Sequence, residues 1–224
     1  MKKIVLLYPV VLLFVLSASC QNNSQQKNIK QETSKQETPV QTKEENGLHK
    51  AYFASGCFWC VEAIFESIYG VQEAISGYSG GTVEKPTYEA SNTGKTGHAE
   101  ANEIIYDPNL VSFSTLVDVY FGSQNITQVN GQGPDNGSQY RSIIFYQNEE
   151  EKQIIESKIA TLNANLGDDR VAAEVLPFQK FWIAEAYHQN YKRNNPTNAY
   201  IQNVSIPRLN RFKSKFPQLL KENN

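Results

Sequence analysis

The sequence has few residues that bind metal ions and little net charge. Cysteine occurs at positions 20, 57 and 60, and histidine at positions 49, 98 and 188, among 224 residues. A structural zinc site would need the cysteine pair and two distant histidines, and a single CxxC is weak evidence for zinc. The formal net charge is -2, which gives no electrostatic signal for nucleic acid. We therefore expect no metal, no cofactor and no nucleic-acid partner.

Long apolar runs are also scarce. The run over 4–16 follows Lys2-Lys3 and is too short to span a bilayer comfortably. Because Ser17-Ala18-Ser19-Cys20 follows it, we predict a signal peptide over 1–19. A cysteine after small residues resembles the lipobox of bacterial lipoproteins, although Ser17 stands where that pattern usually has leucine. We predict lipid attachment at Cys20 and an exported, lipid-anchored envelope protein that faces the periplasm. Conventional cleavage near Cys20 is the alternative.

The next segment contains hardly any apolar residues. Residues 20–46 are mostly Gln, Asn, Lys, Glu, Ser and Thr, so they cannot bury enough apolar surface to offset their ordering entropy. We predict a disordered tether over 20–46, a catalytic domain over 47–212 and a C-terminal tail over 213–224. No internal repeat or second domain is evident, which fits a chain of this length.

The segment Gly56-Cys57-Phe58-Trp59-Cys60 lies between two different apolar patterns. The run over 51–55 is typical of a buried strand, and Val61, Ile64, Phe65 and Ile68 have helical spacing. We therefore expect Cys57 to begin a helix, where backbone N–H groups favour a thiolate. The two rings of Phe58 and Trp59 beside this sulfur suit an apolar group next to an electrophilic centre. Core packing is the alternative for both rings.

The remaining elements predict an α+β domain. We expect strands over 71–78, 103–106, 140–146 and 171–176, and helices over 114–121, 149–166 and 182–192. A glycine turn over 79–81 and long polar loops over 82–98 and 122–139 connect some of them, and loops of that length are often functional. The βαβ-βαβ order predicts a ferredoxin-like split βαβ sandwich with long active-site loops.

Six motifs between residues 52 and 191 carry a specific resemblance. They are Gly56-Cys57-Phe58-Trp59, Gly77-Tyr78-Ser79-Gly80-Gly81, Pro86-Thr87-Tyr88, Thr96-Gly97-His98-Ala99-Glu100, Gln132-Gly133-Pro134-Asp135 and Gly137-Ser138-Gln139-Tyr140-Arg141-Ser142. In this order they resemble the peptide methionine sulfoxide reductase A family.

The resemblance implies a reaction and a site for it. Cys57 would attack the sulfur of methionine (S)-sulfoxide in oxidised proteins and become a sulfenic acid, with free methionine sulfoxide as an open second substrate. Glu100 would be the acid, with a pKa raised by burial beside aromatic rings. Tyr88 and Tyr140 would donate hydrogen bonds to the sulfoxide oxygen. Phe58 and Trp59 would hold the methyl group, and the preference for the S epimer comes from the family alone.

Three further polar residues match the family less decisively. We assign Asp135 and His98 to substrate binding, whereas turn chemistry for Asp135 and a surface position for His98 are the alternatives. His188 either braces the site or is a structural histidine.

The chain departs from the family pattern in two places. Many members have His-Asp-Pro where this chain has Asn125-Ile126-Thr127, which puts only local loop packing in doubt. Many also have recycling cysteines near the C-terminus, whereas no cysteine follows Cys60. We predict that Cys60 condenses with the sulfenic acid to a disulfide, which a thioredoxin-like partner then reduces. The alternative is a buried structural Cys60 and direct reduction by an external thiol. We expect a monomer.

Two other functions compete with this one. A thiol-disulfide oxidoreductase would use the Cys57/Cys60 pair in the same strand-to-helix position, but it would not need the glycine-rich, Tyr88 and Glu100 loops. A non-catalytic envelope lipoprotein that binds peptides would show no turnover. Sulfide formed in step with thiol consumption would separate the reductase from both.

Overall fold

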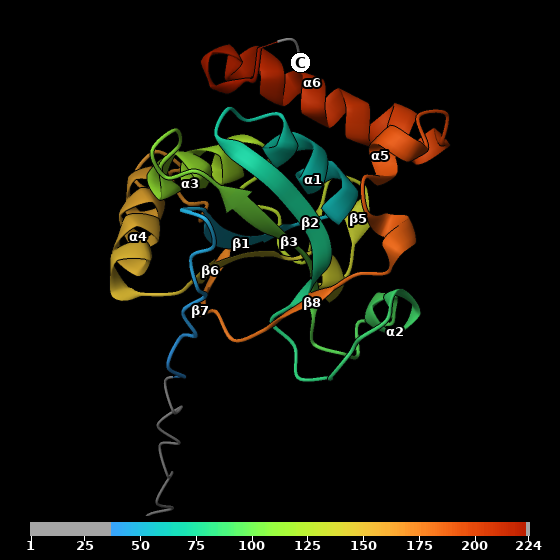
Figure 1. The fold of residues 1–224 in the computed structure, drawn as a ribbon, viewed down its shortest axis with the longest axis horizontal. Coiled ribbons are helices and arrows are strands. Elements are labelled where there is room, and N and C mark those ends of the chain that lie inside the picture. Colours follow the sequence, from blue (N-terminus) through green and yellow to red (C-terminus); the bar gives the residue numbers. More distant parts are fainter. Residues whose placement is uncertain (1–36, 223–224) are drawn as a thin grey trace, which may run out of the picture. The chain divides into compact units, whose positions relative to one another are not determined.

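A six-stranded β-sheet organises residues 37–222, the part of the chain that the computed structural model describes (Figure 1). In spatial order its strands are β7 (Glu174–Pro177), β6 (Ser142–Tyr146), β1 (His49–Ser55), β3 (Ala99–Tyr106), β2 (Val71–Ser79) and β8 (Phe181–Ile183). Neighbouring strands are antiparallel except β6 and β7, which are parallel. The expected signal peptide, Cys20 and most of the expected tether lie outside the described residues.

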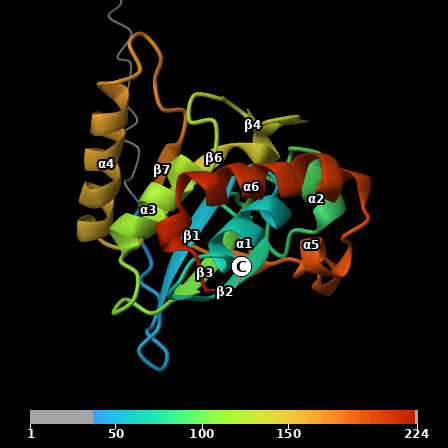
Figure 2. The same ribbon diagram turned by 90° about the horizontal axis from the view of Figure 1, so that it is seen from above.

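Helices cover one face of the sheet and form the main core with it. They are α1 (Phe58–Glu66), α3 (Phe113–Gly122), α4 (Glu149–Asn163) and α6 (Ile206–Lys215), and Figure 2 shows α6 lying across α1. Phe65, Leu116 and Phe212 are among the fully buried side chains between helices and strands. The other face has a smaller cluster, in which Tyr52 stacks on Phe178 with 3.8 Å between ring centroids. Two short helices, α2 (Tyr88–Asn92) and α5 (Tyr191–Asn194), and the two-residue strands β4 (Gly131–Gln132) and β5 (Asp135–Asn136) complete the α-helices and strands of residues 37–222.

Several elements lie where the sequence predicts them. Residues 51–55 of β1 are buried on both sides, as a continuous apolar run requires. Helix α4 begins after Asn148, whose side chain accepts a hydrogen bond from the Glu151 N–H at 2.9 Å. Its apolar face, at Ile154, Ile155, Ile159 and Leu162, packs on the main core as expected. The α+β class is confirmed.

The predicted helix over 182–192 is wrong. Trp182 instead pairs with Tyr78 in the edge strand β8, and a 3₁₀ turn over 186–188 follows it. Sheet pairing outweighs the short helical pattern because β2 would otherwise leave an open edge. Strand β3 also begins earlier than predicted, at Ala99, because the small side chains of Ala99 and Ala101 pack in the core cluster of the second face.

Both ends of the described chain pack on the domain. The Val40 N–H donates to the Phe178 carbonyl at 2.7 Å, and Thr42 hydrogen-bonds to Gln147, so residues 37–46 do not behave as the expected tether. At the other end, the Lys221 N–H donates to the Ser67 carbonyl at 2.9 Å. Residues 213–222 are therefore part of the fold, whereas the sequence predicts a separate tail over 213–224. No helix within 37–222 is long and apolar enough to cross a membrane.

Candidate active site

Cys57 lies at the junction of β1 and α1, at the N-cap position of the helix. Gly56 makes the junction possible because its φ is +79°, a left-handed value that favours glycine. A Cβ at Gly56 would also come within 2.5 Å of the Gln132 Cβ. The strand can therefore turn into the helix against the loop that contains Gln132 only if glycine precedes the cysteine.

Glu100 points its carboxyl group at the same helix end. It lies on β3 opposite Tyr78, and its Oε2 accepts a hydrogen bond from the Phe58 N–H at 3.0 Å. Only 2% of its surface is exposed, and burial raises its pKa to about 8 although the Phe58 hydrogen bond opposes the shift. Glu100 is thus mostly protonated at neutral pH, as the family resemblance implies for an acid.

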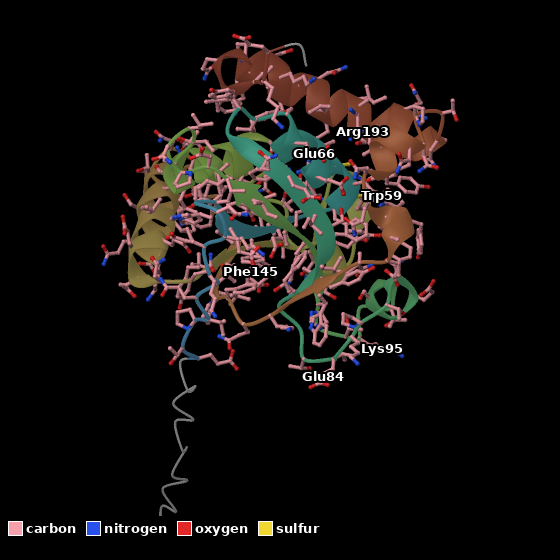
Figure 3. The ribbon with its side chains drawn as sticks, in the orientation of Figure 1. Trp59, Glu66, Glu84, Lys95, Phe145 and Arg193 are labelled. Carbon is pink, nitrogen blue, oxygen red and sulfur yellow. The ribbon has the colours of Figure 1, made fainter. Side chains whose placement is uncertain are left out.

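Aromatic rings form one wall beside Cys57. The Phe58 ring lies parallel to Tyr88 with 6.3 Å between centroids and is tilted against His188 at 4.9 Å. Trp59, at the start of α1 in Figure 3, stacks on Tyr191 with 3.7 Å between centroids and an interplanar angle of 8°. Phe58 is fully buried, whereas Trp59 is partly exposed. The wall is therefore closed at Phe58 and accessible to solvent at Trp59.

His188 holds the indole of Trp59 through a hydrogen bond. Its Nδ1 accepts a hydrogen bond from the Trp59 indole N–H at 3.2 Å, so the remaining proton of a neutral ring is on Nε2. Burial lowers the pKa of His188, which keeps the ring neutral. Within 37–222 no hydrogen-bond acceptor meets its buried Nε2, and the nearest carboxylate oxygen, of Glu185, is 3.8 Å away. The histidine therefore braces the aromatic wall.

Glu185 was not predicted from the sequence, yet it holds two tyrosines. Its carboxylate accepts hydrogen bonds from the Tyr88 N–H at 2.9 Å and from the Tyr78 hydroxyl at 3.0 Å. These bonds fix the start of α2, and with it the position of the Tyr88 ring.

Tyr88 and Tyr140 are both half-buried phenols near the thiol. Burial raises the pKa of each, and the charges of Glu100 and Cys57 add to both shifts. The Tyr140 hydroxyl also donates a long hydrogen bond of 3.4 Å to the Asn92 side chain. Both groups therefore stay protonated and can donate a hydrogen bond to a ligand oxygen.

The two thiols share one negative charge. Burial raises the pKa of Cys57 well above its usual value, whereas the hydrogen bond from Cys57 lowers the pKa of Cys60 to about 6 with help from Arg208. Two adjacent buried thiolates would repel each other strongly, so the pair loses one proton near neutral pH. Burial of Cys57 thus opposes the thiolate that the helix end favours there.

Asp135 reaches this site and His98 does not contact the thiols. The Asp135 carboxylate accepts a hydrogen bond from the Tyr200 hydroxyl at 2.6 Å, and that hydroxyl is 3.8 Å from the Cys60 sulfur. His98 instead accepts from the Gly81 N–H at 3.1 Å and pairs with the Val83 carbonyl at 2.8 Å. It therefore holds the glycine loop in place.

Tyr200 and Arg208 escaped the sequence reasoning although both lie close to the thiols. A signal was present, because Ile201, Leu209 and Phe212 have the spacing of a helix face and all three are buried. A helix predicted there would have placed Arg208 on the buried side next to Leu209. That position would have singled it out, because arginine is almost never fully buried.

Known proteins match both the sequence and the fold. A sequence model of the family described as peptide methionine sulfoxide reductase matches residues 49–220. The chain is 46% identical over 172 residues to peptide methionine sulfoxide reductase MsrA of Pasteurella multocida, covering 77% of this chain and 98% of that protein. It is 45% identical over 175 residues to an MsrA of Acinetobacter baumannii, covering 78% and 99% respectively.

Two solved structures are similar as well. Methionine sulfoxide reductase A of Corynebacterium diphtheriae is 32% identical, with a TM-score of 0.62 and coverage of 69% of this chain and 78% of that one. Mxr1 of Saccharomyces cerevisiae in reduced form is 28% identical with the same TM-score, covering 70% and 91%. The family match spans the catalytic elements and both thiols, and the two MsrA sequences are matched over almost their whole length. The chain therefore belongs to the peptide methionine sulfoxide reductase A family.

Proposed function

We propose that this protein reduces methionine (S)-sulfoxide in oxidised proteins to methionine, with Cys57 as nucleophile and Glu100 as acid. One observation carries the assignment of roles: a buried carboxyl group with a pKa of about 8 points at the helix end where the Cys57 thiol lies. A sulfoxide sulfur accepts a nucleophile only when its oxygen is protonated or strongly hydrogen-bonded. A neutral carboxylic acid beside a thiol supplies both needs of that reaction.

The substrate is held by the aromatic wall. The methyl group of the sulfoxide packs between Phe58 and the partly exposed Trp59, whose indole plane His188 and Tyr191 keep fixed. The sulfoxide oxygen then faces the hydroxyls of Tyr88 and Tyr140, which are protonated because burial raises their pKa. These donors and Glu100 stabilise the charge that develops on the oxygen. Asp135 positions Tyr200, whose hydroxyl is 3.8 Å from the Cys60 sulfur.

The chemical step transfers oxygen from the substrate to the enzyme. The Cys57 proton moves to Cys60, so that the shared negative charge is on the nucleophile. The Cys57 thiolate attacks the sulfoxide sulfur, and Glu100 gives its proton to the oxygen. The S–O bond breaks as the oxygen bonds to Cys57, so methionine leaves and Cys57 becomes a sulfenic acid.

Cys60 then resolves the sulfenic acid. Its sulfur attacks the Cys57 sulfur, water leaves, and a Cys57–Cys60 disulfide forms. Both cysteines are free and buried on the first turn of α1, and within residues 37–222 they are the only cysteines. A thioredoxin-like dithiol returns the pair to the reduced state.

A thiol-disulfide oxidoreductase remains the second candidate because Cys60 has a lowered pKa within a CxxC pair. Turnover of separated R and S epimers of a methionine sulfoxide peptide with a dithiol reductant distinguishes the two functions. The reductase predicts sulfide from the S epimer, one per dithiol consumed, and none from the R epimer. Equal turnover of both epimers, or disulfide exchange without sulfide, would overturn the proposal.

A finer fold assignment rests on strand order. We infer a ferredoxin-like split βαβ core from the central order β6-β1-β3-β2, in which all neighbours are antiparallel and α1 and α3 connect the strands in chain order. Strands β7 and β8 would then be additions at the two edges, and β8 brings the segment with Glu185 and His188 to the active site.

The cellular setting rests on the sequence. We propose a signal peptide over 1–19, lipid attachment at Cys20 and an envelope location facing the periplasm, with the enzyme acting as a monomer. Labelling with a fatty-acid analogue tests the anchor: wild-type protein should incorporate it and Cys20→Ala should not. Light scattering of the domain tests the monomer, and a dimer mass would contradict it.

A further inference from the structure

The C-terminal segment brings polar side chains to the Cys60 sulfur. A π-helical turn over Ile201–Ser205 leads into α6, and such turns are frequent at functional sites. The Ser205 hydroxyl is 1% exposed and has no hydrogen-bond partner within 37–222, yet it helps to lower the pKa of Cys60. The Tyr200 hydroxyl is 3.8 Å from the same sulfur. The segment therefore offers donors where a sulfur anion would lie.

Arg208 adds a full positive charge to this place. It is 8% exposed, and its guanidinium donates to the carbonyls of Ser123 and Ser55 at 3.0 Å and to the Ser55 hydroxyl at 3.1 Å. Its Nη1 would be 3.6 Å from a Cβ on Gly56, the residue before Cys57. Every one of these acceptors is neutral. No carboxylate of residues 37–222 lies within ion-pair distance of Arg208.

A buried cation is costly unless an anion compensates it. The titratable groups that face the two thiols are Glu100 on β3, Asp135 on β5, Tyr88, Tyr140 and Tyr200. Glu100 and the tyrosines are neutral at pH 7 because burial raises their pKa values. The Asp135 carboxylate is engaged by the Tyr200 hydroxyl. Arg208 lowers the pKa of both Asp135 and Cys60, so among residues 37–222 these two groups are the anions that compensate its charge.

We propose that Arg208, assisted by Ser205, is the counter-ion of the Cys60 thiolate and makes Cys60 the leaving group when a dithiol opens the Cys57–Cys60 disulfide. This proposal rests on the recycling route given above. The reductant thiolate attacks the Cys57 sulfur, the S–S bond breaks, and its electron pair leaves on Cys60. The second reductant thiol then attacks the mixed disulfide, which releases oxidised reductant and the Cys57 thiol. Exchange is faster when the leaving thiol has a lower pKa, so Arg208 directs the attack to Cys57.

The pH dependence of alkylation tests the counter-ion without any substrate. Iodoacetamide labelling of the reduced enzyme, read by mass spectrometry at each cysteine, gives the midpoint for Cys60. Arg208→Met should raise this midpoint by about one pH unit or more, whereas Arg208→Lys, which keeps the charge, should restore most of it. Arg211 is exposed on the same helix, so Arg211→Met is the matched control and should leave the midpoint unchanged.

The same variants separate electrostatics from packing. If Arg208 only ties α6 to Ser55 and Ser123 through hydrogen bonds, Arg208→Lys and Arg208→Met should lower the melting temperature and leave the Cys60 midpoint in place. That result would overturn the proposal. Because the labelling needs no sulfoxide, a failure to reduce sulfoxides would remove the proposed function and leave this test valid.

Trapping the exchange intermediate tests the direction of attack. The oxidised enzyme is mixed with a thioredoxin whose second active-site cysteine is replaced by serine, and the mixed disulfide is located by peptide mapping. We expect the link at Cys57 in the wild type, and formation about tenfold slower or slower still in Arg208→Met at pH 7. A link at Cys60, or equal rates in wild type and Arg208→Met, would contradict the assignment.

Discussion

Two buried glutamates, Glu62 within helix α1 and Glu100 beside its N-terminal end, have similar burial and different uses. Glu100 is 2% exposed with a pKa raised to about 8 by burial, and Glu62 is 3% exposed with a pKa raised to about 7 for the same reason. Glu62 accepts from the Ser76 hydroxyl and from the Asn190 N–H, so both its oxygens are engaged. Among residues 37–222, Glu100 accepts a hydrogen bond only from the Phe58 N–H, and it has a thiol beside it. A raised pKa therefore does not by itself identify an acid catalyst; the neighbouring groups do.

Glu62 supports the N-terminal turn of α1 through a chain of hydrogen bonds. Ser76, which donates to Glu62, also accepts from the Asn102 amide, and that amide donates to the Phe58 carbonyl at 3.2 Å. The Phe58 N–H is the group that holds Glu100. The N–H and the carbonyl of Phe58 are thus both held by hydrogen bonds. We therefore expect substitution of Glu100 and substitution of Glu62 to have different effects.

The largest effect is expected for Cys57→Ser. A hydroxyl at this position lacks the nucleophilicity of a thiolate, so sulfoxide reduction should be abolished while the fold is kept. Single-turnover release of methionine, measured beside circular dichroism, checks this outcome. Any retained single-turnover activity would remove Cys57 from the role of nucleophile.

Glu100→Gln should have the next largest effect. The amide can still hydrogen-bond but cannot supply a proton, so the single-turnover rate should fall about 10²- to 10⁴-fold, with substrate binding much less affected. Glu62→Gln is the matched control because it removes a buried carboxyl of similar pKa. Its rate should change by less than about tenfold. Equal slowing in both variants would refute the distinction between the two glutamates.

Cys60→Ser separates the chemical step at Cys57 from the recycling of the enzyme. The variant should release one methionine per enzyme in a single turnover and lose multiple turnovers driven by thioredoxin, because residues 37–222 then hold no second thiol that can condense with the sulfenic acid. Mass spectrometry of the wild type after one turnover should find the Cys57–Cys60 disulfide. Unchanged turnover of Cys60→Ser with thioredoxin would make Cys60 structural.

The smallest effect is expected for the pH dependence of stability in Glu62→Gln. The folded pKa of Glu62 lies above its unfolded value, so its contribution is complete below about pH 4.5 and is lost as pH rises through about 7. Glu62→Gln should therefore show a melting temperature that falls less than that of the wild type between pH 5 and pH 8. Parallel curves for the two proteins would show that Glu62 does not titrate in this window.

The sequence predicts the N-terminal turn of α1 better than the residues from other parts of the chain that contact it. Residues 51–60 fix the strand, the turn and the helix through local apolar spacing and one glycine, so Cys57 could be placed without the structure. Glu100 was found from a motif, but its burial depends on pairing between β2 and β3. Glu185, Tyr200 and Arg208 reach the site through contacts between residues that are 107, 65 and 85 positions apart along the chain, which local patterns do not encode.

The pH dependence of the single-turnover rate tests most directly whether Glu100 is the acid. Burial holds its pKa near 8, so the wild-type rate should fall as pH rises through about 8 and the proton is lost. Glu100→Gln has no proton to lose, so its much slower rate should show no fall in this range and should rise only as Cys57 ionises. If the rate of Glu100→Gln falls above pH 8 as the wild-type rate does, another group supplies the proton and Glu100 is not the acid.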